Sequence, residues 1–104
     1  MLETKTKIRY NIPSKLLNEV AHFAKMHGIQ RIILFGSRGR GDNAERSDID
    51  IAVSGGDADS FYWKIKEKSH TLLTFDIVEL DRGISDELQK EIDRDGIIIY
   101  EKGR

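Results

Sequence analysis

Two short apolar segments, residues 31–35 and 48–53, flank a polar stretch rich in glycine in the middle of the chain. The first, Arg-Ile-Ile-Leu-Phe, is short and β-branched, which predicts a buried strand. The second, Asp-Ile-Asp-Ile-Ala-Val, begins with strict alternation, which predicts a strand that keeps one face in the core. The chain therefore passes from one strand to the next through a segment whose glycines let the backbone approach a ligand closely.

Helix and strand signals alternate along the rest of the chain. Proline is tolerated in the first turn of a helix, and a glycine just past an apolar stripe ends one. Besides the two strands above, these signals predict a helix between Pro13 and Gly28, a helix capped by Asp59 or Ser60, a strand over residues 72–80, a helix between Ser85 and Gly96, and a strand over residues 97–100. This alternation predicts an α/β (α+β) fold, a small mixed β-sheet with helices packed mainly on one side, in a single domain over residues 1–104.

Composition and charge exclude several classes of protein. Hydrophobic residues make up 38% and charged residues 34% of the 104 residues, the balance of a globular chain. The formal net charge of -1 argues against general nucleic-acid binding, which needs a basic excess. Cysteine is absent from the sequence, so disulfides and thiolate metal sites are excluded. Neither a signal peptide nor an apolar run of ~18 residues is present, so we expect no membrane association and a cytoplasmic location.

The glycine-rich stretch carries donors for phosphate. Gly36 directly follows the first strand, and Ser37 and Arg38 lie where a helix or turn begins, with backbone N–H groups free to bind phosphate oxygens. Arg38 and Arg40 add cationic donors, although arginines on exposed loops are commonly solvated. The glycine spacing fits neither the dinucleotide fingerprint nor the P-loop. Alone, a Gly-Ser after a strand usually marks only a turn.

Three aspartates form the second part of the pattern. Asp48 and Asp50 lie two residues apart on one strand, so their side chains share a face with α-carbons about 6.6 Å apart. Two charged carboxylates that close repel each other unless a cation lies between them, and oxygen ligands suit Mg²⁺ or Mn²⁺. Asp76 would add a third carboxylate if its strand lies beside the second; alone, it is equally well explained as a solvent-facing residue. Together they predict two metal ions ~4 Å apart that stabilise an in-line displacement at phosphorus.

The order of these motifs resembles the signature of the polymerase β nucleotidyltransferase superfamily, Gly-Ser followed by a loop and Asp-x-Asp. Residues 36–41, with Ser47 and Asp48, are similar to its minimal single-domain branch, which usually has alanine where this chain has Gly39. Asp76 matches the third carboxylate of the family, and residues 91–100 resemble the last helix and strand of the branch. The resemblance spans about residues 15 to 101.

The resemblance implies roles for eight residues. It places the nucleotide on Gly36, Ser37, Arg38, Arg40 and Ser47. It implies that the catalytic residues, which also bind the metal, are Asp48, Asp50 and Asp76.

The resemblance also implies an activity, which is the transfer of a nucleoside monophosphate, AMP from ATP, with Mg²⁺ as cofactor. Many such proteins are the antitoxin half of a pair with a HEPN ribonuclease toxin and can attach AMP to a toxin tyrosine. Larger relatives hold the acceptor on extra domains, so we expect it here on a partner or on a second copy in a homo-oligomer. The alternative is a binding module that neutralises its partner by occlusion, against which the intact set of acids argues.

Overall fold

The computed structural model describes residues 12–41, 48–68 and 74–103. Its elements follow in the order α2 (Ser14–Met26), β1 (Arg31–Phe35), α3 (Gly36–Arg40), β2 (Ile49–Ser54), α4 (Ala58–Lys68), β3 (Phe75–Glu79), the 3-10 turn η1 (Leu80–Arg82), α5 (Asp86–Asp95) and β4 (Ile97–Glu101). The four strands form one sheet in the order β3-β2-β1-β4. β2 and β3 are parallel, whereas β1 is antiparallel to both β2 and β4, so the predicted mixed sheet is confirmed. Within the described ranges, every helix is too short or too polar to cross a membrane.

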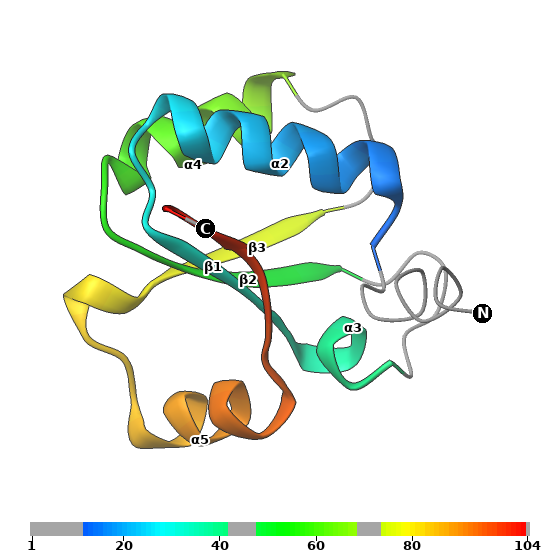
Figure 1. The fold of residues 1–104 in the computed structure, drawn as a ribbon. Helices are drawn as coiled ribbons and strands as arrows, with labels where there is room; N and C mark the ends of the chain where they lie inside the picture. Colours follow the sequence, from blue (N-terminus) through cyan, green and yellow to red (C-terminus); the bar gives the residue numbers. More distant parts are fainter. Residues whose placement is uncertain (1–11, 42–47, 69–73, 104) are drawn as a thin grey trace.

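The two longest of the described helices, α2 and α4, lie on the same face of the sheet, and α5 lies on the other (Figure 1). The larger core lies beneath α2 and α4, and its fully buried members include Val20, Ile32, Leu34, Ile51 and Phe61. A smaller cluster lies beneath α5 and is made of Phe35, Ala52 and Ile92 with partly buried neighbours. The helices therefore pack mainly on one side, as predicted, and α5 covers the face that α2 and α4 leave open.

Local signals explain where most helices begin and end. Pro13 precedes α2, and Gly28 follows it in a left-handed conformation with φ +71°. The hydroxyl of Ser85 accepts a hydrogen bond from the N–H of Leu88 at 3.1 Å, which confirms the predicted cap of α5. Gly96 ends this helix as predicted.

The predicted cap of α4 is wrong. The carboxylate of Asp57 accepts hydrogen bonds from the N–H of Ser60 at 3.1 Å and from its hydroxyl at 2.6 Å. The helix therefore begins at Ala58, before the two expected caps, Asp59 and Ser60. Asp57 caps the helix because its two carboxylate oxygens accept hydrogen bonds from both the N–H and the hydroxyl of Ser60.

Strand boundaries differ from the predictions by one to a few residues. β2 begins at Ile49 rather than at residue 48, and β4 extends one residue beyond 100. β3 spans Phe75–Glu79, whereas the predicted strand began at residue 72, in a part of the sequence outside the described residues.

Two glycines with positive φ allow a matched test of backbone packing. A Cβ on Gly56 (φ +71°) would collide with backbone atoms of Gly28 and Ile29, whereas one on Gly83 (φ +84°) would meet nothing within 4 Å. We expect Gly83→Ala to lower the free energy of unfolding by about 1 kcal/mol, the cost of the left-handed conformation alone. Gly56→Ala should lower it by about 3 kcal/mol or more, because backbone atoms must also move. Urea unfolding of both variants measures the difference, and equal losses would contradict the close approach.

Candidate active site

Asp50 and Asp76 lie side by side on neighbouring strands. The parallel register pairs them directly, and on its other side Asp50 pairs with Phe35 of β1. Side chains alternate along a strand, and Ala52, two residues after Asp50, belongs to the cluster beneath α5. The two carboxylates therefore occupy the α5 face of the sheet, on strands that lie about 4.8 Å apart. This arrangement meets the condition under which Asp76 was expected to join the site.

The environment of Asp50 disfavours its negative charge. Burial raises the pKa of this carboxyl from 3.8 to about 6, and the charge of Asp76 with a hydrogen bond between the two groups adds to the effect. The charges of Asp48 and Glu91 act in the same direction. Like charges held this close share a proton or a cation, so the pair is suited to bind a metal ion with oxygen ligands.

Asp48 directly precedes β2 and is exposed. The next residue, Ile49, donates its N–H to the carbonyl of Thr74 at 2.8 Å, which extends the contact between the beginnings of the two strands. Within residues 12–41, 48–68 and 74–103, no three acidic or histidine side chains lie close enough to hold a metal ion together. A cation site here is thus supported by the Asp50–Asp76 pair, whose carboxylate oxygens are the kind of ligand that Mg²⁺ prefers.

Gly36 brings the backbone close to the carboxylate of Asp50. It joins β1 to α3 with φ +71°, and a Cβ at this position would collide with the carboxylate of Asp50. A glycine is therefore needed here both for its conformation and for the close approach. Ser37 follows in the first turn of α3 and is half-buried, and its carbonyl accepts the N–H of Gly41 at 2.9 Å. Ser47 lies outside the described residues.

The two predicted cationic donors lie in α3, which packs against α5 (Figure 1). Arg38 is only 3% exposed, and burial lowers the pKa of its guanidinium. Arg40 forms an ion pair with Asp95 of α5, with 3.2 Å between Nη1 and Oδ2. Direct contacts of Arg38 and Arg40 with phosphate stay predictions.

Glu91 is a further acidic residue near enough to act on Asp50, and it was not identified from the sequence. It is half-buried on α5, directly before the buried Ile92, and its charge helps to raise the pKa of Asp50. A weak signal existed, because Glu91 is three residues after Leu88 and so lies near the apolar stripe of the helix. Its relation to Asp50 depends on which face of the sheet α5 covers.

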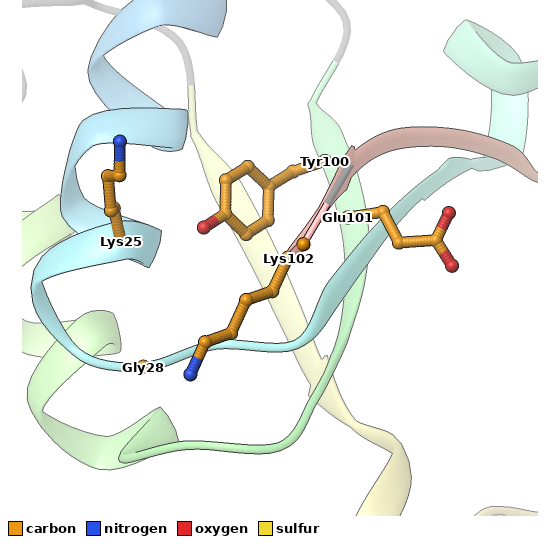
Figure 2. A pocket seen from close by; sticks show the side chains of 6 residues that line it. Lys25, Gly28, Tyr100, Glu101 and Lys102 are labelled. Carbon is orange, nitrogen blue, oxygen red and sulfur yellow. The ribbon is translucent and has the colours of Figure 1, made fainter.

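A cavity of about 230 Å³ lies at the opposite end of the sheet from these carboxylates. It is lined by Gly28 and the end of β4, whereas Asp50 pairs with the last residue of β1. The side chains of Lys25, Tyr100 and Lys102 lie around it (Figure 2). The aspartates contribute nothing to its lining, so the cavity is separate from the candidate active site.

The chain is similar to one protein family in sequence and to several solved structures in fold. The sequence model of the family described as "Polymerase beta, Nucleotidyltransferase" matches residues 18–104. A toxin–antitoxin protein crystallised with AMP-PNP is similar at 26% identity and a TM-score of 0.65, over 84% of this chain and 74% of that one. The toxin–antitoxin MntA-HepT is similar in fold at 24% identity and a TM-score of 0.62, over 86% of this chain and 74% of that one. A protein from Sulfolobus solfataricus is also similar in fold, at 17% identity and a TM-score of 0.56, over 99% of this chain and 88% of that one. A comparison with curated protein sequences gives no match.

The raised pKa of Asp50 makes stability depend on pH. Because this pKa rises from 3.8 to about 6 on folding, the stabilising effect of the protonated carboxyl is full below pH 3.8 and is lost as the pH rises through about 6. We expect metal-free Asp50→Asn to be more stable than wild type at about pH 7.5, by on the order of 1–2 kcal/mol for a partly exposed group, and to have no such advantage at about pH 3.5. Urea unfolding in EDTA at both pH values measures this. Asp59→Asn, whose side chain is 68% exposed, is the control; an Asp50→Asn variant less stable than wild type near neutrality would contradict the account.

Proposed function

Because the chain belongs to the polymerase β nucleotidyltransferase family, we propose that it transfers AMP from ATP to an acceptor in a Mg²⁺-dependent reaction. Family membership confirms the resemblance inferred from the sequence. The observation that best supports the proposed activity is the direct pairing of Asp50 with Asp76, with the backbone of Gly36 against Asp50. Two like charges beside a backbone that can approach a ligand suit a metal-bound triphosphate.

The proposed metal ligands are the three aspartates, Asp48, Asp50 and Asp76, which would hold two Mg²⁺ ions, or Mn²⁺. Among the described residues no three acidic side chains lie close enough to share a metal, so Asp48 would have to move toward the Asp50–Asp76 pair when the metal binds. When bound, the metal neutralises charge on the phosphates and stabilises the attacking and leaving oxygens of the displacement. The pairing of Asp50 with Asp76 and the close approach of Gly36 to Asp50 support a role for Asp50 in binding both the metal and the nucleotide.

The remaining roles concern the nucleotide and the acceptor. We propose that the N–H groups and hydroxyl near Gly36 and Ser37, with Ser47, bind phosphate oxygens, and that Arg38 and Arg40 add positive charge. Asp76 is exposed, whereas Asp50 is half-buried. It is therefore the carboxylate we assign to the acceptor hydroxyl, whose proton it would take up. Positioning and charge neutralisation would supply most of the rate enhancement.

The similar structures support the choice of nucleotide and acceptor. One toxin–antitoxin protein was crystallised with AMP-PNP, which is an analogue of ATP. Because the similar structures at 24–26% identity are toxin–antitoxin proteins, we propose a partner toxin of the HEPN type as acceptor, in the cytoplasm. A second copy of the chain is the other candidate acceptor, and neutralisation by occlusion is the competing outcome of the test.

Calorimetry tests the nucleotide site. We expect Mg²⁺-dependent ATP binding to wild type and a loss of at least about tenfold in affinity in Asp76→Asn, because a metal ligand is removed. Asp59→Asn, an exposed carboxylate on α4, should bind like wild type. Equal binding by the two variants would rule out Asp76 as a ligand.

Transfer to a partner separates catalysis from occlusion. Label from α-labelled ATP should appear on the co-purified partner with wild type and disappear with Asp50→Asn. If Asp50→Asn still neutralised the partner as well as wild type, occlusion would replace catalysis as the function of this fold.

A further inference from the structure

Asp95, the last residue of α5, is a buried carboxylate that has no part in the proposed metal site. It is 8% exposed, and among the described residues the only other buried charged one is Arg38 of α3. Its Oδ2 accepts a hydrogen bond from Nη1 of Arg40 at 3.2 Å, and Arg94 donates two more, at 3.0 and 2.9 Å. The bonds from Arg94 and then from Arg40 hold the pKa of this carboxyl below its usual range.

The backbone of Asp95 also touches α3. A Cβ on Gly39 would collide with the carbonyl oxygen of Asp95 and press on that of Leu34. Two adjacent residues of α3, Gly39 and Arg40, are thus fixed on the same residue of α5, one by backbone packing and the other by an ion pair. This also gives a reason for Gly39, where the minimal branch usually has alanine.

α3 needs such an anchor because it is short. It spans only Gly36–Arg40, and a helix of about one turn is not stable in isolation. Its first residue lies against the carboxylate of Asp50, and its last pairs with Asp95. The contact at Asp95 therefore lies at one end of a short helix whose other end lies against Asp50.

We propose that Asp95 is a positioning residue, which holds α3 through Arg40 and Gly39 so that Gly36 and Ser37 stay in place for the nucleotide. The inference rests on the proposed function. In this proposal Arg40 holds α3 against Asp95, which is a different role from direct contact with phosphate. Loss of Asp95 distinguishes the two uses, because it would release Arg40 toward an anion but would loosen α3.

Arg94 provides the matched control. It forms two of the three hydrogen bonds to Asp95, yet it belongs to α5 and its side chain is 68% exposed. A role of Asp95 confined to the end of α5 would make Arg94→Gln as harmful as Asp95→Asn. A role in placing α3 would make it much less harmful.

Two measurements on wild type, Asp95→Asn and Arg94→Gln test the proposal. The first is Mg²⁺-dependent ATP binding by calorimetry. The second is hydrogen exchange in the metal-free protein at the N–H of Gly41, which directly follows α3 and donates to the carbonyl of Ser37. For Asp95→Asn we expect about tenfold weaker ATP binding and faster exchange at Gly41, with exchange at Ile51 of β2 unchanged. Arg94→Gln should remain within about twofold of wild type in both.

Three results would overturn the proposal: ATP binding by Asp95→Asn as tight as wild type or tighter, unchanged exchange at Gly41, or equal losses in Arg94→Gln. If Asp95→Asn does not fold, Arg40→Gln replaces it. Faster exchange at Gly41 in that metal-free variant supports the anchor, and unchanged exchange leaves Arg40 as a phosphate ligand only. If wild type binds no ATP, the proposed function fails, whereas the exchange data still decide whether Asp95 fixes α3.

Discussion

The parallel register between β2 and β3 is the constraint on which the site depends, because it holds the carboxylates of Asp50 and Asp76 beside each other. The opposite face of the same strands maintains this register. Ile49 and Ile51 are fully buried beneath α2 and α4, and Phe75 is buried with them. A slip of one residue would turn these apolar side chains toward the other face, so the energy of the core opposes it. Burial of apolar side chains on one face of the sheet thus keeps the two carboxylates side by side on the other face.

Two neighbouring carboxylates repel each other when both are charged, and a bound cation would reduce this repulsion. Burial and the neighbouring acids raise the pKa of Asp50 to about 6, so folding makes its charged form less favourable than it is in the unfolded chain. Unfavourable local interactions of this kind are expected at functional sites, and stabilising interactions elsewhere in the structure offset their cost. Here the compensation includes the larger core and the contacts that place α3, since Gly36 must lie against the same carboxylate. A cation with phosphate oxygens would complete the arrangement.

Features encoded by neighbouring residues could be predicted from the sequence, whereas those that join distant segments could not. The cap at Ser85 depends on one turn of chain and was predicted; the cap of α4 was misplaced because Asp57 competes with two adjacent polar residues. Alternation placed Asp50 opposite the core, but its pairing with Asp76 depends on strand order, which the pattern left open. The ion pair of Arg40 spans 55 residues and needs α5 on the same face as α3. The proximity of Glu91 to Asp50 depends on that packing too.

The central claim, that Asp50 and Asp76 form one strained pair suited to a cation, is tested most directly by carboxyl-carbon NMR of Asp50. We expect a pKa of about 6 for Asp50 in the metal-free protein, and a clear fall in this pKa when Mg²⁺ and ATP are added. Titration near the ordinary value of 3.8 without metal, or no response to Mg²⁺ and ATP, would contradict it.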